Sequence, residues 1–423
     1  MAAHDIDRIV IGCLTTGLVA AATLVIGPVA GAEEHVITGT ALVAFAAGWA
    51  LLAALSRRWT TAPQRWAALP AVVLGVAGIG LIALAPAGPD IDALGWLWPP
   101  LLLVLVAATA AGAHRSLRSR TRFSVVYPLL GVYALIAIGG GYQTIEEWRE
   151  RRGPGAPGQM IDVGGHRLHL NCAGSGGPAV VLESGLGEPA DYWRGIAAAV
   201  AGDTRVCVYD RAGRGWSEPA PATQDGVAVA KDLHTLLERG QVRGPFVLVG
   251  HSSGAQYVRI FAGRYPEQVA GVVLLDGQPA EAFEGLPSFP TFYSRFRRAS
   301  ALFPSLARMG VGRLLFGNNH SSARFYRSLR DEFAELPASL QQARSYQNLG
   351  NRPLVVVTAA VDAQAGWLPL QDEMATLSAN SSHRVVPYSH DALITDETAA
   401  QTSTQAIRDA VHAVRTGQPL NRL

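Results

Sequence analysis

The pattern Gly250-His-Ser-Ser-Gly254 puts Ser252 at the centre of a Gly-x-Ser-x-Gly motif. The apolar run before it, Phe246-Val-Leu-Val249, is typical of a buried parallel strand. Residues 253–262 have apolar side chains at helical spacing. A serine in a sharp turn between strand and helix is exposed where a neighbouring base can take its proton and make it a nucleophile. We therefore predict nucleophilic chemistry at Ser252; the alternative is a serine that only caps the helix.

The elements that would position Ser252 alternate regularly after residue 160. Residues 160–163 and 167–172 predict a hairpin around Gly164-Gly165. Apolar runs predict further strands at 179–183, 205–210, 246–250, 269–275, 353–359 and 384–387, with helices at 227–239 and 398–415. This alternation predicts a parallel sheet covered on both faces. Catalytic groups of such a fold lie at the carboxyl ends of the strands.

Six motifs within residues 160–415 together resemble the α/β-hydrolase superfamily, and they occur in that family's order. They are Gly164-Gly-His-Arg-Leu-His-Leu, Glu183-Ser-Gly-Leu-Gly, Val208-Tyr-Asp-Arg-Ala-Gly-Arg-Gly-Trp-Ser, Leu248-Val-Gly-His-Ser-Ser-Gly, Val272-Val-Leu-Leu-Asp and Ser389-His390. The resemblance implies an α/β-hydrolase fold with a helical cap inserted at about residues 277–352. It also implies a serine hydrolase of the esterase kind. Residues 1–145 lie outside the resemblance.

The resemblance implies a catalytic triad with Ser252 as the nucleophile. His390 follows the last core strand, where the family carries its base, and would take the serine proton. The expected acid is Asp362, because it gives the family's chain order Ser, Asp, His. Asp276 is the alternative acid, since a minority of the family places the acid after the strand that follows the nucleophile. We expect His251 to pack beside the site without acting as the base.

Two backbone N–H groups are expected to form the oxyanion hole, one from Ser253 and one from Leu186. In the family this second loop often begins His-Gly, whereas here it reads Ser184-Gly-Leu-Gly187, so only the backbone donors remain. The similar epoxide hydrolases and haloalkane dehalogenases use an Asp nucleophile, and Ser252 sets both aside. No cluster has metal-ligand spacing and no Gly-rich phosphate loop occurs, so we expect no metal and no cofactor.

The 423-residue chain is too long for one ordinary domain. We divide it into a mostly apolar region, 1–145, a Gly/Pro linker, 146–159, and a soluble domain, 160–423. The formal net charge of +2 gives no reason to expect a nucleic-acid partner. Cys172 and Cys207 lie in predicted strands, and we expect two buried thiols, with a disulfide as the less favoured alternative. Cys13 lies in an apolar stretch.

The apolar region predicts a multi-pass membrane protein. Five stretches are long enough to span a bilayer and have no internal charge: 9–31, 36–55, 67–87, 93–113 and 123–141. Tryptophans fall near several span ends, where amphipathic rings favour the interface. Ionisable side chains inside the membrane mark most transport pathways, so their absence argues against a transporter. We interpret this half as an anchor in the lipid bilayer of the cell membrane.

The charges between the spans predict the orientation. Arginines occupy two loops, at positions 57, 58 and 65 and at positions 115, 118, 120 and 122. The alternate loops contain Glu33, Glu34, Asp90 and Asp92 and no Arg or Lys. The positive-inside rule makes the arginine loops cytoplasmic, so an odd number of spans puts the hydrolase domain outside the cytoplasm. Arg149, Arg151 and Arg152 oppose this placement, but three Glu residues are interleaved with them.

The cap insertion is rich in aromatic residues, which indicate a helical cap with its own core. A more specific interpretation is an apolar pocket under a lid.

We therefore expect a membrane-tethered serine hydrolase that cleaves a carboxylic ester with a hydrophobic acyl or alcohol part. An acyltransferase, amidase or aminopeptidase with the same triad stays open, because the pocket and not the fold decides between them. A non-catalytic membrane sensor or scaffold is the alternative of another class.

Overall fold

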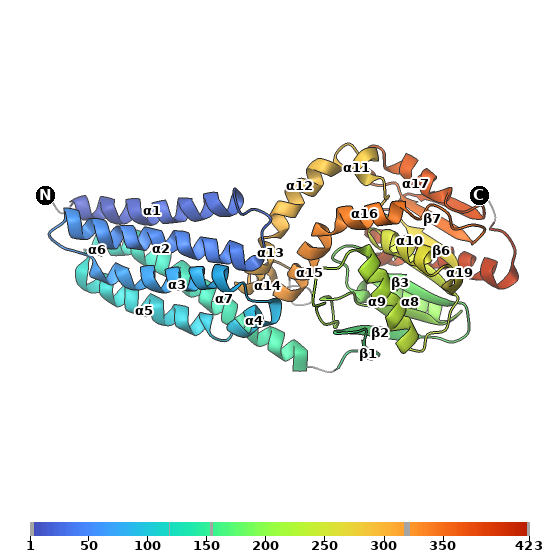
Figure 1. The fold of residues 1–423 in the computed structure, drawn as a ribbon, viewed down its shortest axis with the longest axis horizontal. Helices are drawn as coiled ribbons and strands as arrows, with labels where there is room; N and C mark the ends of the chain where they lie inside the picture. The colour runs from blue at the N-terminus through green and yellow to red at the C-terminus, as the bar shows by residue number, and fades with distance from the viewer. Residues whose placement is uncertain (1–3, 118, 153–154, 317–321, 421–423) are drawn as a thin grey trace. The chain divides into compact units, whose positions relative to one another are not determined.

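Figure 1 shows the computed structural model, which describes residues 4–117, 119–152, 155–316 and 322–420. The chain forms two compact units. The helical unit contains Met1–Gly153 and Phe296–Arg327, and the α/β unit contains Pro154–Arg295 and Ser328–Leu423. The middle of the predicted cap insertion is therefore grouped with the apolar N-terminal region.

The helical unit is a bundle of long apolar helices. They are α1 (His4–Ile26), α2 (Glu34–Trp59), α3 (Ala68–Leu84), α5 (Trp98–Ser116) and α7 (Tyr127–Arg152). Four helical stretches are long and apolar enough to cross a membrane, and a fifth is formed if α4 (Gly88–Leu94) and α5, which are bent by 45°, count as one broken span. Short turns complete the unit: η1 (Arg65–Ala67), α6 (Ser119–Thr121) and the π-helical η2 (Arg122–Val126).

Small residues let the bundle helices approach closely. A Cβ built on Gly39 of α2 would lie 2.7 Å from the carbonyl oxygen of Gly78 in α3, and the reverse approach is equally short. Gly17 of α1 similarly faces Gly48 of α2. Without a hydrophobic driving force between helices in lipid, such close backbone packing is what holds membrane helices together.

Three further segments complete the helical unit, and all come from the predicted cap insertion. They are the end of α12 (Phe289–Ser300), the helices α13 (Phe303–Arg308) and α14 (Val311–Phe316), and the start of α15 (Ala323–Ala334). In Figure 1, α13 and α14 lie at the same end of the bundle as α4. A Cβ on Gly139 of α7 would lie 2.3 Å from the carbonyl oxygen of Met309, so this turn packs directly on the helix backbone.

Charged side chains fasten these segments to the bundle. Arg308 donates to Glu34 and, at 2.8 Å, to Asp92. Arg327 contacts the same two acids, at 3.2 Å and 2.9 Å. Arg313 of α14 donates to Gln143 at 2.7 Å and to Glu150 at 2.8 Å, both on α7. Two of the four acidic residues between the predicted spans, Glu34 and Asp92, thus bind arginines of the inserted segment.

The α/β unit is built on an eight-stranded sheet with the order β1-β2-β4-β3-β5-β6-β7-β8. The strands are β1 (Gln159–Asp162), β2 (Arg167–Ala173), β3 (Ala179–Glu183), β4 (Val206–Tyr209), β5 (Phe246–His251), β6 (Val269–Leu275), β7 (Leu354–Ala359) and β8 (Ser381–Val386). The first two pairings are antiparallel and the rest are parallel. The predicted hairpin and the six later strands are confirmed.

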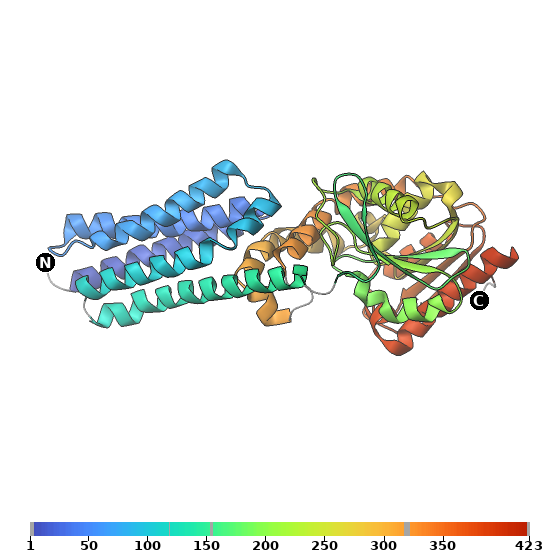
Figure 2. The same ribbon diagram turned by 90° about the horizontal axis from the view of Figure 1, so that it is seen from below.

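Helices cover both faces of the sheet, as Figures 1 and 2 show. Alternate side chains of β5 enter different cores: Leu248 packs with α9 (Gly226–Arg239) and α10 (Gly254–Arg264), while Val247 and Val249 pack with α8 (Arg194–Ala201) and α19 (Glu397–Thr416). This follows from the two-residue period of a strand. The remaining helices are η3 (Ala190–Trp193), η4 (Pro266–Gln268), α11 (Ala282–Gly285), α16 (Leu336–Arg344), α17 (Trp367–Ala375) and α18 (Ala392–Thr395).

Two expectations need correction. Helix α7 continues to Arg152, so the first half of the predicted linker is helical, because its Glu and Arg residues favour a helix as well as a loop. Cys172 and Cys207 form a disulfide rather than two thiols. They are directly opposed on the antiparallel strands β2 and β4, and such opposed residues bring their Cβ atoms close together.

Candidate active site

Ser252 lies in a strained turn between β5 and α10. Its φ angle is +52°, a conformation that is uncommon for residues with a side chain. The two glycines of the motif are required by close contacts: a Cβ on Gly250 would lie 2.8 Å from Ala255, and one on Gly254 would lie 2.5 Å from the carbonyl oxygen of Glu183. The Ser252 N–H donates to the Leu275 carbonyl at 3.1 Å, which ties the turn to β6. This is the geometry of a nucleophile elbow.

His390 lies beyond β8, and its ring is held by Asp276. The His390 Nδ1 is 2.6 Å from Asp276 Oδ2. The other carboxylate oxygen accepts from the Trp367 indole N–H at 2.8 Å and from the Ala359 N–H at 3.1 Å. Since an ionised carboxylate only accepts, Nδ1 carries a proton, and in the neutral ring Nε2 then keeps a lone pair. The His390 side chain is 37% exposed and Asp276 only 5%, so the ring is accessible while its acid is buried.

The His390 ring contacts Asp276 and not the expected acid, Asp362. Asp362 lies exposed in the turn after β7, with a φ of +65°, whereas the His390 contact goes to Asp276. Asp276 ends β6, which neighbours the nucleophile strand, and it takes a φ of +43° that turns its carboxylate toward β7 and His390. Both aspartates follow strands, so chain order alone could not choose between them. Asp276 was the stated alternative.

The His251 ring lies next to the His390 ring and binds Glu188, a residue that was not predicted from the sequence. Their contact joins His251 Nδ1 and Glu188 Oε1 at 2.7 Å, and the second Glu188 oxygen accepts from the Gly185 N–H at 2.6 Å. His251 Nε2 lies 3.1 Å from the His390 carbonyl oxygen, and the two rings are 4.5 Å apart. Ligand atoms of Glu188, His251 and His390 lie within 4.8 Å of one another, a spacing that a metal ion could bridge. In the structure His251 instead uses both nitrogens in hydrogen bonds.

The loop expected to supply an oxyanion donor, 184–188, is fixed by Arg211. This buried guanidinium donates to the carbonyl oxygens of Ser184 and Gly185, the latter at 2.7 Å. It also binds Glu183 at 2.6 Å and lies over the aromatic ring of Tyr257, with the guanidinium carbon 4.9 Å from the ring centroid. Because the carbonyls of this loop are occupied by Arg211, its backbone is held in one conformation beside the start of α10, where Ser253 lies.

A second buried acid extends this network into the cap insertion. Glu332 of α15 binds both Arg211 and Arg214. Burial raises the pKa of Glu183, against the opposing pull of Arg211. A carboxylate buried at this depth is stable in its charged form only with such partners. The network therefore joins strand β3, the expected oxyanion loop and the end of α15.

The sequence carried a weak signal for these supporting residues. Glu188 directly follows the Ser184-Gly-Leu-Gly187 loop, and Arg211 directly follows the strand-ending Asp210. An acid or a base beside a loop is usually solvated, so its burial could not be read from spacing. Glu332 and Trp367 are distant in sequence from the residues they bind, and their contacts arise from tertiary packing.

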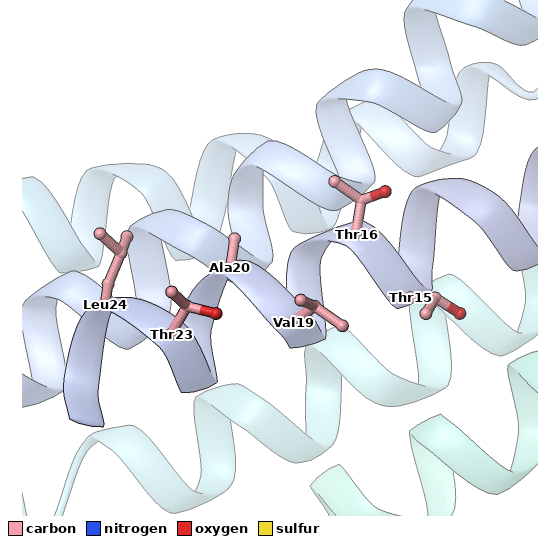
Figure 3. A pocket seen from close by; sticks show the side chains of 6 residues that line it. All are labelled: Thr15, Thr16, Val19, Ala20, Thr23 and Leu24. Carbon is pink, nitrogen blue, oxygen red and sulfur yellow. The ribbon is translucent and has the colours of Figure 1, made fainter. Parts of the chain in front are cut away.

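A separate apolar hollow of about 510 Å³ lies on the helical unit (Figure 3). Its lining consists of residues of α1 alone: Thr15, Thr16, Val19, Ala20, Thr23 and Leu24. It offers hydroxyls but no acid or base, and it is therefore distinct from the site around Ser252.

The comparisons with known proteins agree with the fold of the α/β unit. Residues 178–368 match the family model for the α/β hydrolase fold. The α/β unit belongs to the α/β-hydrolase superfamily. The solved Cif epoxide hydrolase from Acinetobacter nosocomialis is 16% identical, has a TM-score of 0.52, and aligns over 64% of this chain and 96% of its own. At that identity the likeness concerns the fold.

Two curated relatives match parts of this chain. The uncharacterized protein YqjL of Bacillus subtilis (strain 168) is 27% identical over 226 residues, which cover 50% of this chain and 79% of YqjL. RutD of Klebsiella pneumoniae (strain 342) is 35% identical over 114 residues, which cover 26% of this chain and 42% of RutD. The chain thus spans less than half of the RutD length.

Proposed function

We propose that the chain is a membrane-anchored serine hydrolase that cleaves carboxylic esters through Ser252, His390 and Asp276. The observation that carries this proposal is the 2.6 Å contact between His390 and Asp276 beside a serine held at the elbow. Such a contact fixes the tautomer in which Nε2 can accept a proton. In this proposal the imidazole would link the Ser252 hydroxyl to the buried carboxylate.

The reaction follows from these positions. His390 Nε2 takes the proton as Ser252 Oγ attacks the ester carbonyl, and the Asp276 carboxylate stabilises the imidazolium. The backbone N–H groups of Ser253 and Leu186 would hold the oxyanion. His390 returns the proton to the leaving alcohol, and a water activated by the same imidazole then hydrolyses the acyl-enzyme. The serine separates this proposal from epoxide hydrolysis, which uses an Asp in the similar family.

The composition of the cap supports an apolar substrate. Within the α/β unit five rings pack in a chain of edge and stacked contacts: Phe283, Phe289, Phe292, Tyr293 and Phe333. Phe289 and Phe333 are buried, Phe283 and Tyr293 are half-buried, and Phe292 is 52% exposed. An exposed aromatic ring beside a packed aromatic cluster favours contact with a hydrophobic acyl or alcohol group.

Membrane anchoring is supported by the helical unit. In Figure 1, α6 lies at one end of the bundle and α4, α13 and α14 lie at the other. Arg57 and Arg58 lie in the last turn of α2, whereas Glu34 and Asp92 bind arginines of the inserted segment. Arg149, which opposed the proposed orientation, pairs with Glu146 at 2.6 Å. The disulfide also favours an oxidising compartment for the hydrolase domain.

The test is ester hydrolysis by the full chain purified in detergent, using p-nitrophenyl butyrate and octanoate. We expect turnover of both esters and a lower KM for the octanoate. Ser252→Ala should lose at least ~1000-fold in kcat. The matched control is Ser345→Ala, which removes the hydroxyl of an exposed serine and should react like wild type. Equal hydrolysis by Ser252→Ala and wild type would refute the proposal.

A further inference from the structure

The contacts of His251 fit a doubly protonated ring. Its Nε2 faces the carbonyl oxygen of His390, which only accepts, so Nε2 must carry a hydrogen. Its Nδ1 faces a Glu188 oxygen, and an ionised carboxylate also only accepts. Glu188 uses its second oxygen to accept from the Gly185 N–H, which leaves the first for His251. Every donor and acceptor is matched when His251 is an imidazolium and Glu188 a carboxylate.

We propose that Glu188 and His251 are a buried ion pair that positions the catalytic machinery, by tying the oxyanion loop 184–188 to the segment that carries His390. This inference rests on the proposed function. The chain of contacts runs from the Gly185 N–H through the Glu188 carboxylate and the His251 ring to the His390 carbonyl. It joins the loops after β3, β5 and β8, which hold the oxyanion donor, the nucleophile and the base.

The surroundings of the pair support an ionised state. The charged and titratable groups that face His251 are Glu188, His390 and Asp276. Burial, the largest influence, opposes the charge, but the Glu188 carboxylate outweighs it and raises the pKa of His251. The pKa of Glu188 is lowered despite burial, because His251 and the Gly185 N–H stabilise its charge. The His251 ring is fully buried and packs edge-on against Trp193.

Glu188→Gln separates geometry from charge. The glutamine oxygen can accept from Gly185 N–H, and its amide can donate to Nδ1 of a neutral His251, which still donates from Nε2 to His390. All three hydrogen bonds survive without an ion pair. Glu188→Ala removes the bond to Gly185 and the partner of Nδ1. The matched controls are Glu238→Gln and Glu238→Ala, which alter an exposed glutamate on α9.

The pair also predicts a difference in pH dependence. When wild-type His251 loses a proton at high pH, it keeps one hydrogen for two acceptors, so either the Glu188 or the His390 bond is lost. Activity should therefore fall as the pH rises through the raised pKa of His251. In Glu188→Gln a neutral His251 satisfies both neighbours, and this fall should be absent.

The experiment measures kcat and KM for p-nitrophenyl butyrate from pH 5 to 10, together with the rate of fluorophosphonate labelling, in the full chain. We expect Glu188→Gln to stay within about threefold of wild type at pH 7 and to keep its activity to higher pH. Glu188→Ala should lose about 10- to 100-fold in kcat with little change in KM, the range seen when a residue that orients a catalytic group is removed.

The outcomes distinguish a failure of this inference from a failure of the proposed function on which it rests. Two outcomes would overturn the ion pair as a positioning device in a wild type that is labelled. One is labelling of Glu188→Ala at the wild-type rate. The other is a loss of activity in Glu188→Gln as large as the loss in Glu188→Ala. If Glu188→Ala does not fold, identical alkaline profiles of wild type and Glu188→Gln would overturn it as well. A folded wild type that neither labels nor turns over ester would overturn the proposed function and this inference together.

Discussion

At the scale of single residues, the site depends on which aspartate orients His390. Asp276 contacts the ring and Asp362 is exposed. We predict that Asp276→Asn loses about 10⁴-fold in kcat, because an amide that donates to Nδ1 imposes the wrong tautomer. Asp362→Asn, the matched control, should stay close to wild type. Ester hydrolysis by the two variants decides between the acids, and a larger loss in Asp362→Asn would contradict this assignment.

The residues predicted from sequence were those with a local signature. Ser252 has glycines on both sides and a strand before it, and His390 follows the last core strand. The acid has no such local signature, since Asp276 and Asp362 each follow a strand. What separates them is the orientation that Trp367 and the Ala359 N–H give to one carboxylate, and this orientation is a property of the folded sheet.

A second buried pair, His169 with Asp210, predicts how stability depends on pH. The His169 Nδ1 is 2.8 Å from Asp210, and its Nε2 donates to the Pro157 carbonyl. Burial opposes the charge of each residue, but their mutual contact raises the pKa of His169 and, with the N–H groups of Ala190 and Trp216, lowers that of Asp210.

The stabilisation from His169 is complete below its unfolded pKa of about 6.5 and is lost as pH rises through the raised folded value. The stabilisation from Asp210 is present above about 3.9 and is lost as pH falls through its lowered value. We expect His169→Gln to cost about 1–3 kcal/mol at pH 6 and less at pH 9. Chemical denaturation at both pH values tests this, and a cost that grows with pH would contradict it.

At the scale of elements, Arg211 connects β3, the oxyanion loop and α15 through four acceptors. We predict that Arg211→Ala costs about 3–5 kcal/mol, since it leaves Glu183 buried without its cation. Arg211→Lys keeps the charge but lacks the planar fork, so it should retain more stability yet label more slowly with a fluorophosphonate. Arg239→Ala, at an exposed arginine, is the control. Equal labelling by Arg211→Lys and wild type would contradict the role of the fork.

Elements with strong periodic patterns were predictable, and those decided by packing were not. The parallel strands from β3 to β7 are buried except at Ala270, and their sequences are apolar runs. The fourth apolar stretch was predicted as one span, but it bends by 45° between α4 and α5. Pro99 and Pro100 follow that bend, and proline is favoured in the first turn of a helix, which makes a new start there understandable.

At the scale of the whole molecule, the inserted segment is divided between the units. Residues of α15 up to Arg327 are grouped with the bundle, and those from Ser328 with the sheet. Composition could not have predicted this division, because the aromatic residues of the insertion are spread over both parts. The arginines that bind Glu34 and Asp92 could not have predicted this division either, since a lone arginine in a sequence is usually solvated.

The interaction free energy between the bundle and the inserted segment can be measured by a double-mutant cycle. Asp92 and Arg327 are 16% and 12% exposed and share further partners, so we expect a coupling of about 1–3 kcal/mol between Asp92→Ala and Arg327→Ala. The matched control is the pair Glu146 and Arg149, whose arginine is 65% exposed and whose coupling should be below about 0.5 kcal/mol. Thermal unfolding in detergent measures both. If the losses of unfolding free energy in Asp92→Ala and Arg327→Ala simply add, the proposed binding of the inserted segment to the bundle through this pair is contradicted.

The disulfide and the direction of the spans make one joint prediction. Protein from membranes prepared with free thiols blocked should gain two maleimide–polyethylene glycol tags only after reduction, at Cys172 and Cys207. Cys172→Ser with Cys207→Ser is the control and should gain none. No tagging even after reduction would show that both residues were free thiols when they were blocked, as expected of a reducing compartment.

The central claim is that Ser252 is an activated nucleophile on the outer face of a membrane. The most direct measurement treats intact cells with a fluorophosphonate probe that cannot cross the bilayer, comparing wild type with Ser252→Ala. We predict labelling of wild type alone, because only a serine with a proton-accepting imidazole attacks the phosphonate at a useful rate. Absence of labelling in cells and after permeabilisation, with folded protein present, would contradict the account; labelling only after permeabilisation would contradict the orientation.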